Sequence, residues 1–393
     1  MTSARISSRQ LGIACAAACG IAAARAAAQP AYPAHDVGHS VEEQAAPSPA
    51  GEPRPSVALA PAAPARSRMR PGFLPALGAL VPGLAVHGTG HFIGGDARTG
   101  RRLVLAQGIG LATAAAGAVP LALTGASDHV STFSLPLVVA GTGMLVLGWA
   151  ADVYGSAGGP RLAGVPAPVA PGSEIGLGYL YVRDPHFAYT SFVNLDALVR
   201  AGDWHLEAAA ALALDDDNQR LRVRAGHRFL GPGPTRRAAT GTALDLLAAV
   251  TVHRHGTDGF TTVTPEAVAH GRLDLAQMSS SLSGAFVEGD LGLGLDRAAY
   301  RHAPADAVGI LVGRFGFGMY LGHPDATHGE VQVFYDHRRD GLVGGLATRR
   351  FNGIAGSFGA QGALTVRPGM GVSFQAQAGS AYLLGIGLRY TRP

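Results

Sequence analysis

From Ile175 to Tyr390 the chain alternates between apolar residues and small or polar ones, in segments of about 10 to 14 residues separated by turn-forming clusters. Successive side chains of a β-strand point to opposite faces, so a period of two predicts half-buried strands. A helix would need apolar residues at a period of 3.6 instead. The region is therefore predicted to be mainly β.

One face of this alternation is strongly charged. In residues 219–230 the odd positions are mostly apolar, as at Leu221 and Val223, whereas the even positions carry four arginines. Guanidinium groups are too costly to place against lipid or in a dry core, so this face must be wet. Other segments place charged side chains in the matching register. The residues predicted to share the wet face are Arg220, Arg222, Arg224, Arg228, Asp196, His270, Arg272, Asp274, Glu288 and Asp290.

Two architectures fit an alternation of this kind. A transmembrane barrel places the apolar face against lipid and the charges in its lumen, whereas a soluble sandwich or barrel buries the apolar face. The segments are long enough for tilted strands to cross a bilayer, and connections such as Arg367-Pro368-Gly369 are tight. These features favour an antiparallel up-and-down transmembrane barrel.

Thirteen segments qualify as strands, among them 267–278 and 341–351. Bacterial single-chain barrels have even strand numbers, so we predict about 12 strands over residues 172–393, with 14 as the alternative. Such a lumen is narrower than that of an open porin and should be partly filled by side chains. Its charges either satisfy one another or form a selectivity ladder for an anionic solute.

The last predicted strand ends in Leu383-Leu384-Gly385-Ile386-Gly387-Leu388-Arg389-Tyr390. This pattern resembles the terminal assembly signal of bacterial outer-membrane β-barrels, although the aromatic residue is followed here by Thr391-Arg392-Pro393. The resemblance implies insertion into the outer membrane of a Gram-negative cell.

A hydrophobic region precedes the barrel, within residues 72–155. Leu103–Ser127 and Val130–Ala151 are 25 and 22 residues without a charged side chain. Each is long enough to cross a hydrocarbon core of about 30 Å as a helix. The turn-forming residues between them predict a helical hairpin. A third apolar segment, Phe73–Val86, contains two prolines and should lie at the membrane interface or pack on the hairpin.

The stretch Val81-Pro82-Gly83 and Gly88-Thr89-Gly90-His91-Phe92-Ile93-Gly94-Gly95 resembles the Pro-Gly-x-Gly-His/Gln-aromatic-x-x-Gly loop of two-helix TM2-like membrane modules. It departs from that loop by the extra residues Leu84–His87 and by Ile93. The resemblance implies a membrane hairpin without catalytic chemistry. His87 and His91 are candidate metal ligands, but no carboxylate or third ligand stands at suitable spacing, so no metal site is predicted.

The first 28 residues have the pattern of a secretory signal peptide: a basic start with Arg5 and Arg9, an apolar run, and a small-residue cleavage site at Ala26-Ala27-Ala28. Both cysteines, Cys15 and Cys19, lie within it, so no disulfide is expected after cleavage. Lipidation at Cys19 is the alternative. Residues 29–71 form a disordered Pro/Ala-rich linker by composition, and residues 156–171 form a second linker.

The composition restricts the function. All 31 basic residues are arginine, the net charge is only +4, and the arginines are dispersed, so no nucleic-acid partner is predicted. No Gly-x-Ser-x-Gly or P-loop motif is present, and we predict neither an enzyme nor a cofactor. The predicted role is a narrow pore or envelope scaffold in the outer membrane, in contact with lipid and with other envelope proteins as candidate partners. The alternative is an inner-membrane anchor that carries a soluble periplasmic β-domain, which binds a partner.

Overall fold

The computed structural model describes residues 69–392, with gaps at 126, 185–189, 236, 257–258, 301–303, 339–340, 344–345 and 348–353. The predicted signal peptide, and residues 29–68 of the first predicted linker, lie outside the described residues.

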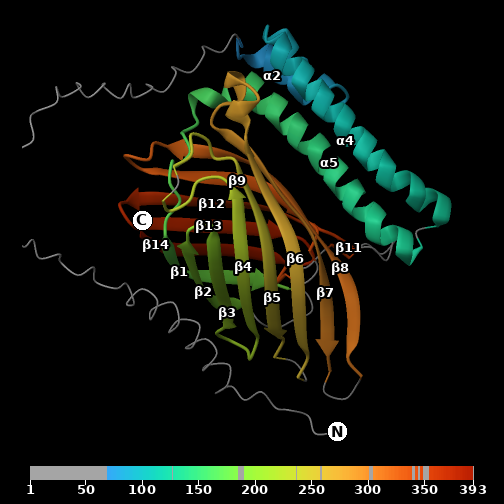
Figure 1. Cartoon of the computed structure of the whole chain (residues 1–393), viewed down its shortest axis with the longest axis vertical. Coiled ribbons are helices and arrows are strands. Elements are labelled where there is room, and N and C mark those ends of the chain that lie inside the picture. Colours follow the sequence, from blue (N-terminus) through green and yellow to red (C-terminus); the bar gives the residue numbers. More distant parts are fainter. Residues whose placement is uncertain are drawn as a thin grey trace, which may run out of the picture. The chain divides into compact units, whose positions relative to one another are not determined.

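The C-terminal region is a closed antiparallel barrel of 12 strands, which confirms the predicted fold class and strand number. Each strand pairs with its neighbour along the chain, and β1 pairs with β14 from Ser173–Arg392 to Arg183–Tyr382 to close the sheet (Figure 1). The strands are β1 (Ser173–Arg183), β2 (Ser191–Ala201), β3 (Trp204–Ala213), β4 (Gln219–Leu230), β5 (Ala243–Arg254), β6 (Thr261–Asp274), β7 (Ala285–Ala299), β8 (Asp306–Gly322), β9 (His328–Asp336), β12 (Ser357–Arg367), β13 (Met370–Ala378) and β14 (Tyr382–Arg392).

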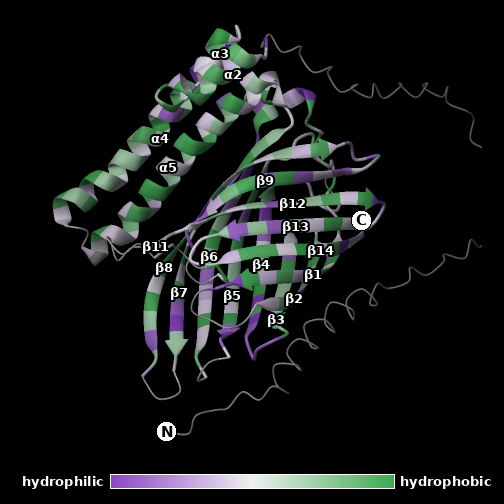
Figure 2. Cartoon of the chain, turned by 180° about the vertical axis from the view of Figure 1, so that it is seen from behind, coloured by the Kyte–Doolittle hydropathy of each residue, from purple (hydrophilic) through white to green (hydrophobic). Residues whose placement is uncertain are grey.

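The apolar face of the sheet points outward. On β14, Leu384, Ile386 and Leu388 are about 60% exposed, whereas Leu383, one position out of phase, is buried inside. Figure 2 shows this alternation of hydropathy along the strands. The outer surface is therefore one that lipid would cover, and the polar residues line the interior.

Aromatic side chains mark both edges of this outer surface. Near the end where β1 begins and β14 ends, here named the terminal mouth, Trp204, Phe229 and Tyr390 are exposed on the outside. Near the opposite end, the far mouth, the exposed aromatic residues include Tyr382 and Phe358. Tyr382 and Tyr390 are separated along one strand by about 26 Å, which at a strand tilt of about 40° spans roughly 20 Å of an apolar band that is about 25 Å tall in outer-membrane barrels.

Two predicted segments differ from the observed strands. The described residues of the predicted segment 341–351 form no barrel strand: Leu346–Ala347 is β10, which pairs with β11 (Ile354–Ala355) in a separate two-stranded sheet. The segment predicted at 267–278 begins earlier, at Thr261, and its end forms the 3-10 helix η3 (Leu275–Gln277). Pro265 fits inside β6 because the pairing register with β7 skips it, so its missing N–H costs little there.

The predicted helical hairpin is formed by α4 (Ala97–Thr124) and α5 (Asp128–Ala157), both long and apolar enough to cross a membrane. The two helices pack closely, since a methyl group at Gly141 would lie 2.4 Å from the Ala114 amide nitrogen. Their base carries α2 (Phe73–Leu80), η1 (Pro82–Leu84), α3 (Thr89–Ile93) and η2 (Gly159–Arg161). As expected, the third apolar segment packs on the hairpin, where the Trp149 indole N–H donates to the Ala79 carbonyl at 3.0 Å.

The hairpin runs along the outer wall of the barrel beside β7 and β8 (Figure 1). Glycines on each side allow the contact: Gly143 of α5 faces the Phe315 ring, and Gly313 of β8 faces Val139. The base of the hairpin meets the β6–β7 connection, which contains η3 and η4 (Ser280–Leu282). The sequence did not predict where the hairpin lies relative to the barrel. Its position depends on the side-chain packing described here.

Candidate functional site in the barrel interior

Charged side chains of opposite sign meet across the interior. Glu266 of β6 is fully buried and binds Arg222 of β4 and Arg338, which follows β9; the Arg338 contact is 2.6 Å. The residues between β9 and β12 therefore begin by folding into the lumen instead of leaving it.

A second network surrounds Arg272 of β6. Its guanidinium group binds Glu288 at 2.8 Å and Glu330 at 2.7 Å, and Gln332 donates to the other Glu288 oxygen at 2.8 Å. The Arg314 guanidinium group lies 3.9 Å from Glu288 as well. The network thus connects strands β6, β7, β8 and β9 across the lumen.

Three further pairs connect adjacent strands. Arg228 donates from two nitrogens to Asp245, at 2.7 and 2.8 Å, in the bidentate geometry that guanidinium and carboxylate groups favour. Arg224 binds Glu207, and His270 Nδ1 lies 2.6 Å from Asp290. Ion pairs of this kind connect neighbouring strands of the barrel wall, and the interior remains polar.

The structure brings most of the predicted lumen residues into these pairs. Arg220 lies on the same inward face of β4 as Arg222. Asp196 accepts a hydrogen bond from Asn194 at 3.2 Å. Asp274 has a different environment: it accepts backbone N–H bonds from Gly241 and Ala276 at the end of β6 and caps η3.

Sequence reasoning missed many of the partners. Arg200 and Arg389 lie near strand ends, and Arg338 lies on a connection. The missed interior residues are Glu174, Arg200, Asp245, Glu266, Arg314, Glu330, Arg338 and Arg389. The inward parity of their strands is a signal that could have found those within strands, but no pattern in the sequence identifies which strands pair to close the barrel.

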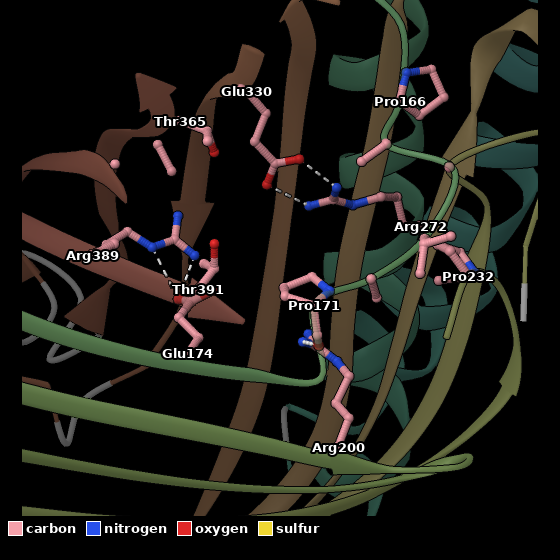
Figure 3. Close-up of a pocket in the computed structure, with 18 of the residues that line it drawn as sticks. Pro166, Pro171, Glu174, Arg200, Pro232, Arg272, Glu330, Thr365, Arg389 and Thr391 are labelled. Carbon is pink, nitrogen blue, oxygen red and sulfur yellow. Dashed lines mark hydrogen bonds and ion pairs between the residues drawn. The ribbon is translucent and has the colours of Figure 1, made fainter. Parts of the chain in front are cut away.

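A cavity of about 590 Å³ lies inside the terminal mouth, and we name it the vestibule (Figure 3). Its wall carries five guanidinium groups, those of Arg200, Arg224, Arg228, Arg272 and Arg389, and four carboxylates, those of Glu174, Glu207, Asp245 and Glu330. Arg389 and Glu174 form an ion pair in it, from β14 to β1. The vestibule is therefore a polar chamber that can hold a small hydrophilic molecule.

Residues 164–171 cross the terminal mouth on their way from the hairpin to β1, and we name them the strap. The Gly164 and Val165 amides donate to the carbonyls of Tyr320 and Gly322, at 2.8 and 3.2 Å, at the end of β8. Pro168 O accepts from the Ala238 amide at 3.0 Å, and Pro171 O accepts from Arg200 Nη1 at 2.8 Å. The strap lines the vestibule, so it narrows the entrance.

A second cavity of about 300 Å³ continues inward from the vestibule, with which it shares Glu330 and Arg389. Its lining includes amide and carboxylate side chains, such as Asn194, Asp196 and Gln361. The two cavities form a polar path along the inner wall.

An apolar cluster lies at the far mouth, beyond this path. Leu180, Val182, Phe192 and Leu383 point inward from β1, β2 and β14, and Val343 from the β9–β12 connection packs against them. Because these side chains are buried together, the lumen is not polar over its whole length, contrary to the simple alternation rule.

The hairpin base holds a buried His–Asp pair. His91 Nδ1 lies 2.7 Å from Asp152 Oδ1, both side chains are fully buried, and Asp152 also accepts the Gly90 and His91 amides. Sequence spacing did not reveal this carboxylate partner, because α5 brings it from 61 residues away. Within the described ranges, no three His, Cys, Asp or Glu side chains are grouped to hold a metal ion.

A polar junction connects the hairpin to the β6–β7 connection. Asp96 caps α4 and accepts hydrogen bonds from Thr99 and Ser281, at 2.7 and 2.9 Å. Burial opposes ionisation of Asp96, but these hydrogen bonds outweigh it, so the pKa of Asp96 is lowered below its ordinary value. The junction is therefore built around an ionised carboxylate.

No family model and no curated protein matches this chain. Among solved structures, the translocator domain of the autotransporter NalP from Neisseria meningitidis is similar at a TM-score of 0.34 and 12% identity, over 56% of this chain and 88% of that one. The NanC porin is similar at a TM-score of 0.33 and 10% identity, and the KdgM porin at 0.31 and 8%, each over 55% of this chain and 98% of the other. These similarities are limited to the barrel fold and do not indicate a function.

Proposed function

We propose that this chain is an outer-membrane β-barrel that acts as a narrow, partly filled pore. The observation that supports this most directly is the orientation of the closed sheet: leucine, isoleucine, valine and aromatic side chains cover its outside, and ion pairs and polar cavities lie inside. An exposed apolar surface that surrounds a barrel is stable in lipid and unfavourable in water.

The same orientation weighs against a soluble periplasmic β-domain. Such a domain would bury these aliphatic side chains against one another, whereas here Leu291, Leu293 and Leu295 of β7 are all exposed. The proposal includes a cleaved signal peptide at residues 1–28 and a hairpin that stays in the same membrane as the barrel.

A scaffold without conductance is the second candidate, and one observation favours it. The strap crosses one mouth and the apolar cluster around Val343 occupies the other. If both remain in place, solutes cannot pass, and the barrel would serve to hold the hairpin or envelope partners.

Membrane insertion is tested by fractionation and by heat-modifiability on detergent gels. The full-length protein should fractionate with outer-membrane markers and should migrate differently before and after boiling. Recovery with inner-membrane markers, or solubility of a fragment 170–393 without detergent, would contradict the proposal.

Conduction is tested in planar bilayers with a chain that carries Arg222→Glu and Arg224→Glu. Both side chains lie on the inward face of β4, so exchanging their charge should shift the ion preference toward cations. Arg254→Gln, at an exposed strand end, is the control and should leave the preference unchanged. Absence of ion current through the folded parent protein would favour the scaffold, and equal selectivity in a folded double variant would show that Arg222 and Arg224 do not set the ion preference.

A further inference from the structure

Most arginines of the interior have a carboxylate partner. Within 4 Å of a carboxylate oxygen lie the guanidinium groups of Arg222, Arg224, Arg228, Arg272, Arg314, Arg338 and Arg389. Arg200 of β2 differs from them: among the described residues no carboxylate pairs with it, and its one side-chain hydrogen bond goes from Nη1 to the Pro171 carbonyl at 2.8 Å. Its Nε is buried without a hydrogen-bond partner within the described part of the chain.

The vestibule therefore has one guanidinium group more than it has carboxylates, and Arg200 is the one that has no carboxylate within 4 Å among the described residues. The lining has five guanidinium groups against four carboxylates, and each of the other four guanidinium groups is paired. Figure 3 shows Arg200 directed toward Pro171 of the strap, at the edge of the open cavity. A guanidinium group in a partly dehydrated site binds an oxyanion more strongly than a neutral carbonyl.

The strap is held by few bonds. Pro166, Pro168 and Pro171 have no N–H to donate. Residues 166–171 are held to the described part of the barrel by hydrogen bonds to the Pro168 and Pro171 carbonyls. The Pro171 carbonyl occupies the position on Arg200 that a carboxylate would take. Loss of that contact would free the end of the strap next to β1.

We propose that the vestibule binds a small carboxylate-bearing solute, which takes the Arg200 guanidinium group in place of the Pro171 carbonyl and thereby loosens the strap across the terminal mouth. The cavity of about 590 Å³ is large enough for such a molecule. This inference deepens the proposed pore function and rests on it for the aqueous route to the site.

The test uses thiol labelling of the strap in the full chain, purified in detergent micelles. Cys15→Ser and Cys19→Ser remove the natural thiols from any chain whose signal peptide is not cleaved. Ala170→Cys, at a strap position that is 9% exposed, reports on opening. The probe is succinate, compared with sodium chloride at equal ionic strength and with succinamide as an uncharged analogue. Succinate should raise the labelling rate by roughly three- to tenfold, as expected for an opening made about 1 kcal/mol easier.

Arg200→Gln should label rapidly without any solute and show no further response to succinate. Arg254→Gln, which removes an exposed guanidinium group at the far mouth, is the matched control and should behave like the parent. If Arg200→Gln does not fold, Arg200→Lys retains the charge without the planar fork and should respond more weakly than the parent.

Three results would overturn the inference: no response to succinate, an equal response to chloride, or an undiminished response in a folded Arg200 variant. Labelling in micelles does not require conduction. If the protein conducts ions but its labelling rate does not respond to succinate, only this inference is refuted. If the labelling rate responds but the protein does not conduct, only the proposed pore function is refuted.

Discussion

Glu266 is the interior carboxylate on which two arginines depend. It is fully buried and pairs with Arg222 on the wall and with Arg338 on the β9–β12 connection. Breaking a buried ion pair from one side leaves an uncompensated charge, which costs far more than losing an exposed pair. At this scale, stability depends on whether each buried charge keeps its partner.

Glu266→Gln should lower the free energy of unfolding in micelles by about 3 kcal/mol, because two guanidinium groups would lose their carboxylate. Glu330→Gln is the matched control: Glu330 is 39% exposed, and Arg272 would keep Glu288. The control should cost about 1 kcal/mol or less. Urea titration of both variants measures this, and equal losses would show that burial does not set the cost.

At the scale of elements, small residues determine how the hairpin packs. Gly141 of α5 faces the α4 backbone at Ala114, whereas a side chain at Gly108 would meet open space. The sequence predicted two apolar helices and their turn correctly, but the contact face depends on which glycines meet in space.

Gly141→Val should separate α4 from α5, because its side chain would collide with the Ala114 backbone. Overpacking of this kind costs about 1 to 3 kcal/mol. Amide hydrogen exchange in α4 should then become roughly tenfold faster, since 1.4 kcal/mol corresponds to a factor of ten. Gly108→Val should leave exchange unchanged. Similar acceleration in both variants would contradict the close approach at Gly141.

The junction between α4 and the β6–β7 connection should depend on pH through Asp96. The pKa of Asp96 is lowered in the folded protein, so the stability it contributes is present above its ordinary pKa of 3.8 and is lost as the pH falls through the lower folded value. Asp96→Ala should cost about 1 kcal/mol at pH 6, by loss of the cap, and less near pH 3. Urea unfolding at both pH values measures this, and a gap that widens on acidification would refute it.

At the scale of the whole molecule, the exposed apolar belt makes the barrel dependent on lipid. Leu293 lies near the middle of β7 and faces outward, and Trp204 faces outward at the terminal-mouth edge. A charge at the first position would lie deep in the hydrocarbon, and one at the second would lie near the head groups.

Leu293→Arg should lower the stability of the lipid-embedded barrel by about 2 to 4 kcal/mol, and Trp204→Arg by about 1 kcal/mol or less from the charge itself. Unfolding in lipid vesicles followed by gel mobility measures the difference. If Leu293→Arg were neutral, its side chain would be facing water and the membrane orientation would be wrong.

The alternation after Ile175 predicted the strands and separated the two faces of the sheet, because a period of two is a local property of the chain. It did not by itself decide which face points outward, and the number of 12 strands also needed the rule that bacterial barrels have an even strand number. Two uncharged runs were sufficient for the hairpin. Only the tertiary structure decided that Glu266 forms ion pairs with Arg222 and Arg338, and that Asp152 pairs with His91. It also decided that residues 164–171 cross the terminal mouth beside Arg200. Those contacts join residues far apart in the chain, and closure of the barrel sets their positions.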